Sequence, residues 1–600
     1  MFKFKVSYVA LAAALSATYV HADPTTYTHQ SETKIIDIET PNGAGVSHNL
    51  YRDFSVDDKG LILNNSSVDY NHDKFGGIAK NNNLSGGSAS VILNEVISKT
   101  PSTLKGFIEV GGQKADVVIA NPNGITCSGC SFINTNKALL TTGKVNLTET
   151  GSIGSYTVTT GILNVGKEGM DASSSYAILL ADVINLNGML NAQNAQLSAG
   201  NFTADNITGK ITPGSKETTF FNKLSPTYSI DVSSLGGIKA NSITIVGNNL
   251  GFGVRNKGAI VASTGLAMTS NGTLINEGSI TGNGLISNLA SAGNFTNSGT
   301  LATKYVSTIT SYGAVTNSGT IKNGMQMGIV AAGNIDNSGY ITSEQTLNVA
   351  TNGNLTTKYG SVIRSENLLN ITTLGNIDNG GGMQGKQTTV NFGGSAFNVS
   401  GNISGSDKLS ILATKNNAST SGNISSSGTM SGRDVELVTK GAINLADTSN
   451  LKVSNSLNAK SSSLYNAGYI TGINGQYGDL FFDNSTSENS LTAGIYGKSV
   501  TFDTWNDMYN YGLIQGFNDV DINTHFNGDL INRGRIYTDK LTISADKVNN
   551  GGYRCGIMFL KLCGVGTLDA NKLVLNARHN YASEMGGVQR IKSFEVNTVK

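Results

Sequence analysis

Short apolar segments that alternate with polar residues, and that are separated by Asn-Gly or Ser-Gly pairs, recur along most of the chain. In residues 34–64, for example, Ile36 and Ile38 alternate with polar residues ahead of the turn Pro41-Asn42-Gly43. Alternation with a period of two is typical of β-strands, and apolar residues in the i, i+3, i+4, i+7 order of an amphipathic helix are scarce. The pattern therefore predicts an all-β fold with many turns.

From about residue 250 one unit repeats, with the form apolar-x-Asn-x-Gly-x-apolar. A weaker copy has Lys358 in the Asn position, and the phase loosens between about residues 385 and 455. A period near 20 residues without intervening helices predicts a right-handed parallel β-helix with N-terminal capping strands, because leucine-rich repeats of similar spacing need a denser Leu pattern. The clear copies contain Asn256, Asn276, Asn297, Asn317, Asn337, Asn379, Asn466, Asn510 and Asn532.

The repeated Asn admits two structural roles. Its side-chain amide can stack from coil to coil, or its backbone can take the left-handed turn position beside Gly. Both roles are architectural, so these residues are not interpreted as a binding site.

A different motif, ANPNGITCSGCSFINTNKALLTTG, occupies residues 120–143. Pro122 fixes φ in a turn, Asn123 tolerates left-handed geometry, and Gly124 adopts what the turn requires. A strand is expected to lead into Asn121 and another to resume at Ile125. The motif therefore predicts a tight turn between two strands.

The chain has four cysteines, of which Cys127 and Cys130 lie in this motif. Zinc would need further ligands nearby, a thioredoxin-like redox site would need a βαβ pattern, and free thiols would be open to oxidation after export. A local disulfide is favoured over these three, because the count is even and the chain carries an export signal. Cys555 and Cys563 are expected to close a second loop.

The export signal is the N-terminal segment 1–22, where Lys3 and Lys5 precede an apolar run that ends at Val20-His21-Ala22. Its removal leaves 40 basic against 41 acidic residues. Phosphate binding needs a clustered basic surface, so nucleic acid is not expected as a partner. With 38% hydrophobic residues and almost no net charge, the chain should fold after export.

A catalytic site is not expected, although parallel β-helices also include polysaccharide-acting enzymes. Such enzymes need clustered carboxylates with a basic residue, and none of the six His lies at metal-ligand spacing or beside an obvious nucleophile. We therefore predict no catalytic residue, metal or cofactor. Tyrosines flank the late repeats and are interpreted as cross-coil packing in preference to an exposed binding stripe: Tyr465, Tyr469, Tyr509, Tyr511, Tyr537 and Tyr553.

Three segments carry a resemblance to a known family: TPNGAGVSHNLYRDFSV at 40–56, ASVILNEV at 89–96 and ANPNGITCSGCSFINT at 120–135. In this order they resemble the secretion domain of two-partner secretion exoproteins of Gram-negative bacteria. That family includes filamentous haemagglutinins, haemolysins and contact-dependent growth inhibition toxins. The segment 228–258 resembles the junction with haemagglutinin repeats.

The resemblance implies a β-helical secretion domain that an outer-membrane β-barrel transporter recognises through periplasmic domains, followed by passage of the unfolded chain to the cell surface. Asn121, Pro122, Asn123 and Gly124 would form the secretion motif, and Cys127 with Cys130 the cysteine pair found in part of the family.

The expected domains are the signal at 1–22, the secretion domain at 23–260 and a repeat stalk at 261–600. The expected protein is a haemagglutinin-like adhesin or the stalk of a growth inhibition toxin, which would bind a receptor on a host cell or a neighbouring bacterium. A pore-forming haemolysin is the alternative, and a polysaccharide-acting enzyme the remote one. Any toxin activity is expected C-terminal to residue 600.

Overall fold

The computed structural model describes residues 23–214, 228–414, 422–551, 553–555, 561–563, 565–578 and 587–599, so the predicted signal at 1–22 lies outside the described residues. The chain divides into two compact units. Unit 1 comprises residues 1–184 and 201–214, and unit 2 comprises residues 185–200 and 215–600. Within the described ranges, no helix has both the length and the apolar character to cross a membrane.

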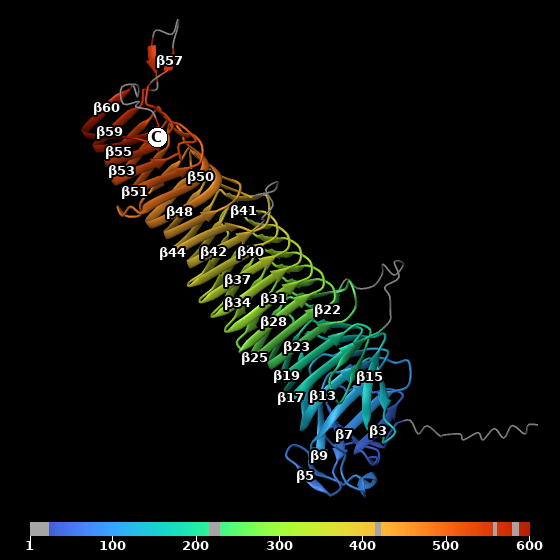
Figure 1. Cartoon of the computed structure of the whole chain (residues 1–600). Helices are drawn as coiled ribbons and strands as arrows, with labels where there is room; N and C mark the ends of the chain where they lie inside the picture. Colours follow the sequence, from blue (N-terminus) through green and yellow to red (C-terminus); the bar gives the residue numbers. More distant parts are fainter. Residues whose placement is uncertain are drawn as a thin grey trace, which may run out of the picture. The chain divides into compact units, whose positions relative to one another are not determined.

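Unit 1 is built from three stacks of parallel strands, which the chain visits in turn in each coil (Figure 1). The first stack contains β3 (Val46–Tyr51), β7 (Val91–Val96), β10 (Ala115–Ala120), β13 (Thr135–Thr141) and β17 (Met170–Ala181). The second contains β2 (Lys34–Asp37), β4 (Leu61–Asn65), β9 (Phe107–Gly112), β12 (Cys130–Ile133) and β17. The third contains β8 (Ser102–Leu104), β11 (Ile125–Cys127) and β16 (Ile162–Val165).

Antiparallel elements decorate this solenoid. β1 (Thr26–Thr28) pairs antiparallel with β2, at the N-terminal position predicted for a capping strand. A separate sheet comprises β14 (Lys144–Leu147), β15 (Ile153–Val158), β20 (Phe202–Asp205) and β21 (Ile211–Pro213), and a hairpin comprises β5 (Tyr70–His72) and β6 (Gly76–Ile78). Among the described residues, the single helical element is η1 (Asn82–Leu84), a turn of 3-10 helix.

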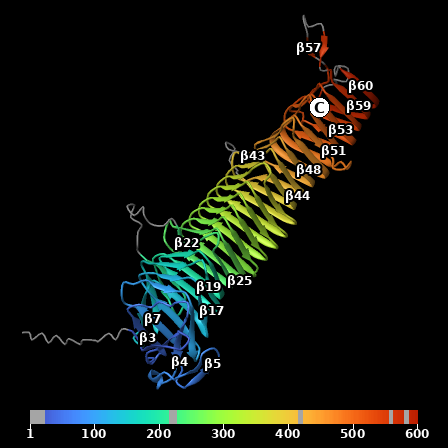
Figure 2. The same ribbon diagram turned by 180° about the vertical axis from the view of Figure 1, so that it is seen from behind.

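Unit 2 repeats the same plan more regularly, and Figure 2 shows its strands stacked in succession from behind. Its coils begin with β19 (Met189–Ala199), β22 (Tyr228–Val232), β23 (Gly237–Gly247) and β25 (Ala259–Ser270). The first row of short parallel strands is β24 (Gly253–Asn256), β26 (Leu274–Asn276), β29 (Phe295–Asn297), β32 (Val315–Asn317), β35 (Ile335–Asn337), β38 (Leu355–Thr357) and β41 (Ile377–Asn379).

Two further rows complete these coils. One is β27 (Ser279–Gly282), β30 (Thr300–Thr303), β33 (Thr320–Asn323), β36 (Tyr340–Ser343) and β39 (Val362–Ser365). The other is β28 (Ile286–Ser291), β31 (Val306–Ser311), β34 (Gln326–Ala331), β37 (Thr346–Thr351) and β40 (Leu368–Thr373).

Later coils of unit 2 fuse neighbouring rows into long strands, in most cases the second and third rows. These are β42 (Gly382–Phe392), β44 (Asn402–Ala413), β46 (Thr429–Val438), β48 (Asn450–Asn466), β50 (Asp479–Asn489), β51 (Gly494–Thr504), β53 (Leu513–Asn523), β55 (Arg535–Ala545), β59 (Thr567–Ala577) and β60 (Val588–Thr598). The first row continues as β43 (Ala396–Val399), β45 (Asn423–Ser426) and β47 (Ala442–Leu445), then as the C-terminal ends of β48 and β50, and then as β52 (Met508–Asn510), β54 (Leu530–Asn532) and β56 (Val548–Asn549). The short strand β49 (Tyr469–Thr471) belongs to the second row.

The repeated Asn residues stack, which decides between their two predicted roles. Asn256 Nδ2 donates to Asn276 Oδ1 at 2.9 Å, and Asn276 Nδ2 donates to Asn297 Oδ1 at 2.7 Å. Asn297 and Asn317 continue the same pattern at 2.8 Å each. None of these residues has positive φ, so the left-handed alternative is wrong for them.

The exact phase needed two corrections. Thr357, and not Lys358, takes the Asn position of the weaker copy, because Thr357 pairs with both Asn337 and Asn379 in register. A coil that sequence spacing skipped contributes Asn489, which accepts from Asn466 Nδ2 at 2.9 Å. Between residues 385 and 455 the coils persist although the Asn pattern stops.

The all-β prediction and the β-solenoid are therefore confirmed. In the regular coils, alternate side chains point inward, and Ile309, Ile329 and Val349 are buried at successive levels. Apolar residues of this kind form one continuous core along unit 2.

Candidate functional site

The three segments singled out in the sequence lie on adjacent strands of unit 1. Residues 46–51 form β3, residues 91–96 form β7, and Ala120 ends β10. Asn49 pairs in register with Asn94, and Glu95 pairs with Ala120. Segments more than twenty residues apart in sequence thus lie side by side in one parallel sheet of unit 1.

Asn121 directly follows β10 and links two coils. Its side chain is fully buried, and its Nδ2 donates to Thr100 O and to Ser102 Oγ, both at 2.9 Å. Its Oδ1 accepts from the backbone N–H of Asn123 at 3.0 Å, which closes the turn. Each of these bonds satisfies a buried polar group, so Asn121 is a structural latch of the turn.

The other three motif residues divide by exposure. Pro122 and Asn123 are exposed, whereas Gly124 is buried with φ at +114°. A Cβ on Gly124 would lie 3.1 Å from Ile162 O of the next coil, so glycine is required both by φ and by space. A partner of the folded unit could therefore contact Pro122 and Asn123 directly.

Cys127 and Cys130 form a disulfide in the structure, with Cα atoms 5.4 Å apart. Both residues are buried, and the disulfide closes the corner between β11 and β12. Gly129 N donates to Gly169 O at 2.8 Å, and Gly166 N donates to Cys127 O at 2.7 Å. The corner is thus held by the following coil as well as by its own covalent link.

The second cysteine pair lies near the end of the chain. The strands β57 (Tyr553–Cys555) and β58 (Lys561–Cys563) pair antiparallel, with Cys555 opposite Lys561. The side chains of Cys555 and Cys563 lie outside the described residues, so their pairing stays a prediction.

The sheet β14–β15–β20–β21 covers the outer face of the first stack. Val118, Ala120 and Leu139 point outward from that stack and belong to one buried cluster with Tyr156 and Phe202 of the covering sheet. A hydrogen bond from a side chain to the backbone also links the two sheets' loops, because Asn42 Nδ2 donates to Gly151 O at 2.8 Å. Sequence reasoning missed this layer, although the consecutive apolar residues of β10 and β13 are typical of strands buried on both faces.

A hydrogen bond between a histidine and a carboxylate links two strands of the same stack. His48 Nε2 on β3 lies 2.8 Å from Glu95 Oε2 on β7, and both side chains are partly exposed. His48 therefore bonds a neighbouring coil. No acid–base chemistry is needed to explain its position.

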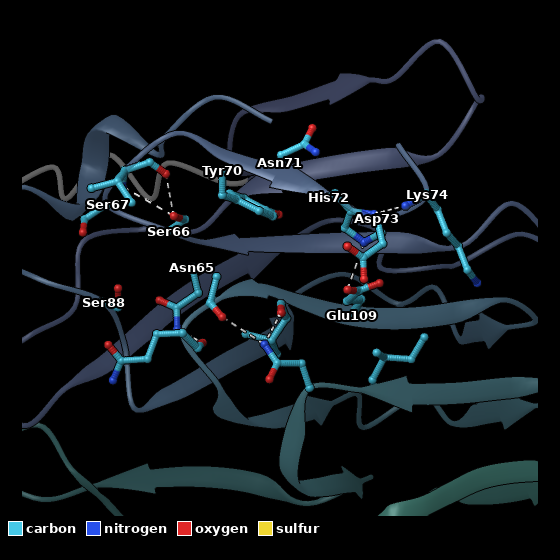
Figure 3. A pocket seen from close by; sticks show the side chains of 16 residues that line it. Asn65, Ser66, Ser67, Tyr70, Asn71, His72, Asp73, Lys74, Ser88 and Glu109 are labelled. Carbon is cyan, nitrogen blue, oxygen red and sulfur yellow. Dashed lines mark hydrogen bonds and ion pairs between the residues drawn. The ribbon is translucent and has the colours of Figure 1, made fainter. Parts of the chain in front are cut away.

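The β5–β6 hairpin shields a polar cavity of about 710 Å³ in unit 1 (Figure 3). His72 is nearly buried, and its Nδ1 accepts from Lys74 N at 3.0 Å. The neutral ring therefore carries its proton on Nε2, which donates to Glu109 Oε1 at 3.0 Å. Burial, with the nearby Glu109 carboxylate, raises the pKa of Tyr70 well above its ordinary value.

This cavity has no assembly of catalytic groups. Within the described part of the chain, no group of three or more His, Cys, Asp or Glu side chains is placed to hold a metal ion. The contacts around the cavity stabilise the hairpin. Phe75 stacks on His72 at 4.6 Å, and Ile78 packs on Ile35 and Ile62.

Comparison with known proteins shows what the N-terminal region is similar to. Residues 13–288 match the family model described as TPS secretion domain. The chain is 40% identical over 260 residues to "Toxin CdiA" of Yersinia pestis, which covers 43% of this chain and 8% of that protein. It is also 40% identical over 243 residues to "tRNA nuclease CdiA" of Yersinia mollaretii, covering 40% of this chain and 8% of the relative.

Among solved structures, the "Crystal structure of filamentous hemagglutinin secretion domain" matches with a TM-score of 0.39 and 26% identity, covering 51% of this chain and 94% of that one. Because this TM-score is low, the fold is assigned from the strand pairings of the chain itself. The chain spans about 8% of the length of the two curated relatives.

Proposed function

We propose, from the premise that residues 13–288 of this chain are a TPS secretion domain, that the protein is the exported partner of a two-partner secretion system. The observation that carries the proposal is the parallel sheet in which β3, β7 and β10 bring the three sequence segments together. Its expected partner is an outer-membrane β-barrel transporter with periplasmic recognition domains. The expected location is the cell surface or medium of a Gram-negative bacterium, reached through the periplasm.

The fold offers a physical reason for transport without a nucleotide-hydrolysing motor. In a solenoid each coil contacts mainly its neighbours, so folding can proceed coil by coil as the chain emerges. Folding outside the cell would then bias transport outward. The N-terminal unit, with its own buried cluster, would provide the first template.

For the part beyond the secretion domain, we favour the stalk of a growth inhibition toxin or an adhesin over a haemolysin. The support is the identity of 38–40% to relatives named "Toxin CdiA" or "tRNA nuclease CdiA". Those names describe relatives of which this chain covers about 8%, so no nuclease activity is assigned to these 600 residues. The domain boundary near residue 260 and the secretion role of Asn121–Gly124 remain part of the proposal.

The central test is secretion with and without the cognate transporter. Expressed with it, the chain should collect in the medium or on the cell surface, and without it in the periplasm, as measured by immunoblot of fractions. Equal secretion in both strains would overturn the proposal.

Variants of the motif can separate recognition from folding. The double variant Pro122→Ala, Asn123→Ala changes exposed residues and should lower secretion strongly. The urea midpoint of the purified protein should fall only slightly, through loss of the bonds from Asn123 Nδ2 to Ser98 O and Asn121 Oδ1. The matched control is Thr208→Ala, Lys210→Ala in the exposed turn between β20 and β21, which should be secreted normally. Equal secretion of both double variants would remove the motif from recognition.

The choice between an adhesin and a toxin stalk depends on the target cell. Purified chain labelled with a fluorophore should bind neighbouring bacteria if it is a growth inhibition stalk, and host epithelial cells if it is an adhesin. Lysis of erythrocytes by the purified chain would favour the haemolysin alternative.

A further inference from the structure

A groove along one corner of unit 2 combines aromatic rings with arginines. It lies where the first row of strands turns into the second, across the coils that contain β49, β51, β53 and β55. We call it the tyrosine–arginine groove, and it is lined chiefly by Tyr469, Tyr496, Tyr511, Leu513, Arg533 and Arg535. Its volume is about 420 Å³.

Several of the tyrosines singled out in the sequence are partly exposed. Tyr469 is 46% exposed, Tyr465 41% and Tyr537 49%. Each of these rings therefore has exposed surface that can meet a ligand, and the cross-coil packing preferred from sequence stays a prediction. The side chain of Tyr553 lies outside the described residues.

A glycine creates the floor of the groove. A Cβ on Gly494 would lie 2.6 Å from Tyr496 Cε2 and 3.1 Å from Tyr469 Cδ1. Because Gly494 has no side chain, both rings can lie against the backbone of β51. We call these two rings the aromatic platform of the groove.

Arg535 lies two coils after Tyr496 and three coils after Tyr469, because β49, β51, β53 and β55 pair in succession. Arg533 N donates to Asn510 O just as Tyr511 N donates to Asn489 O, so Arg533 occupies the position of Tyr511 in the next coil. Leu513 pairs in register with Arg535. Adjacent coils are about 4.8 Å apart, so platform and arginines lie within the span of a short oligosaccharide.

Four other described arginines of unit 2 are paired with carboxylates. Each of Arg255, Arg364, Arg433 and Arg590 lies within 4.0 Å of a carboxylate. Among the described residues, neither Arg533 nor Arg535 has such an acidic partner, and none of the residues that line the groove is Asp or Glu. Arg533 Nη1 instead donates to Asn549 Oδ1 at 2.9 Å, which fixes the direction of its guanidinium.

A peptide strand would find no pairing edge here. β51 pairs with both β49 and β53, and β53 pairs with β55, so the backbone groups along the groove are already used. Strand addition, the usual way in which a sheet captures an extended peptide, is therefore closed. A flat aromatic surface suits the apolar face of a sugar ring, and an arginine fork suits a carboxylate or sulfate.

We propose that the tyrosine–arginine groove binds an acidic oligosaccharide, with a sugar ring over Tyr469 and Tyr496 and its acidic group on Arg535 and Arg533. This binding activity goes beyond secretion and does not depend on it. The groove would give the repeat region a ligand of its own.

The test uses the purified full chain and titration calorimetry at about 50 mM salt, where exposed charges are weakly screened. Sialyllactose and a glucuronic-acid tetrasaccharide should bind, and lactose should not. Arg535→Gln and Tyr496→Ala should each weaken binding about tenfold or more. Arg535→Lys should be intermediate, because it keeps the charge and loses the fork.

Matched controls lie outside the groove. Arg364→Gln changes an arginine paired with Glu366, and Tyr340→Ala changes a ring that is 51% exposed on another coil. Both controls should bind like the unaltered chain, and circular dichroism should show that every variant folds.

Three results would overturn the proposal. One is the absence of millimolar or tighter binding to both acidic sugars, and another is equal binding of lactose. The third is binding of a poly-glutamate peptide with the same dependence on Arg535, which would point to an acidic protein partner. If the proposal holds, binding to epithelial cells before and after sialidase, and to bacteria with and without capsule, distinguishes the two sources of the sugar.

Discussion

Unit 1 and the regular coils between β24 and β41 use the same stacked parallel strands and bury them differently. In unit 1 the outward side chains Val118 and Leu139 lie beneath the sheet that contains Phe202. In the regular coils the outward Val306 is 40% exposed, and only the inward side chains are buried. The difference shows that a solenoid needs one buried face to extend, while a second covered face distinguishes the unit that contains the three motif segments.

The covering layer provides the sharpest test of this comparison. Phe202→Ala removes a fully buried ring between two sheets and should destabilise unit 1 by about 3–5 kcal/mol. Val306→Ala should change the free energy of unfolding little. The measurement is urea unfolding followed by circular dichroism.

The chain's single Trp, Trp505, lies in unit 2 and gives a second probe. If the two units unfold separately, Phe202→Ala should leave the fluorescence midpoint of Trp505 unchanged. A shared shift of both signals would show that the units unfold as one, and a small effect on circular dichroism would contradict the role of the cover.

The Asn ladder tests the regular coils. Asn317→Ala removes an amide that donates to Asn337 Oδ1 and accepts from Asn297 Nδ2, which leaves buried partners unsatisfied. The expected loss is about 1–3 kcal/mol. Thr316→Ala, an exposed position on the same strand β32, is the matched control and should be nearly neutral in urea unfolding. Equal effects of the two variants would refute a specific role for the ladder.

The disulfide should matter less than either core. Its ring contains four residues, so the double variant Cys127→Ala, Cys130→Ala should cost about 2 kcal/mol or less in unfolding free energy. Mass analysis without reductant should find Cys127 joined to Cys130 in the exported protein. Free thiols there would contradict the disulfide, and a loss as large as that of Phe202→Ala would contradict the chain-entropy account.

The smallest expected effect concerns Asp521 on the outer face of β53. Burial, then repulsion from Asp519 and Asp503, raises the pKa of Asp521. A raised folded-state pKa favours folding below the unfolded pKa, and this contribution is lost as pH rises through the folded pKa. Asp521→Asn should therefore increase stability slightly near pH 7 and not near pH 3, measured by urea midpoints. Asp447→Asn, on an exposed turn, is the control; equal shifts at both pH values would be contrary to this sign.

The repeat could be read from sequence where the same residue performs the same task in every coil. Asn256 to Asn337 are such a series, because each must bond its neighbour. After Asn379 the ladder position is held by Val399, Ser426 and Leu445 in successive coils. The strands still pair in register there, although the amide hydrogen bond between neighbouring Asn side chains is lost. Spacing alone could not follow a position whose chemistry changes while its geometry does not.

The candidate site shows a similar limit. The turn at Asn121–Gly124 was predictable, because Pro122 and Gly124 have strong local preferences. The bonds from Asn121 to Thr100 and Ser102 were not, since they join residues about twenty positions apart. The positions of Tyr469 and Tyr496 could not be predicted either. They depend on Gly494, whose lack of a side chain leaves room for both rings.

The Asn ladder has a direction as well as a period. From Asn256 to Asn317, and again from Asn466 to Asn532, every bond between two ladder residues runs from the Nδ2 of one Asn to the Oδ1 of the Asn in the later coil. Where Leu445 precedes Asn466, the Oδ1 of Asn466 is buried without a partner. A half-built array therefore presents unpaired N–H donors at its C-terminal face. Growth from the N-terminus satisfies those donors one coil at a time, so the side chains themselves encode which end of the molecule extends.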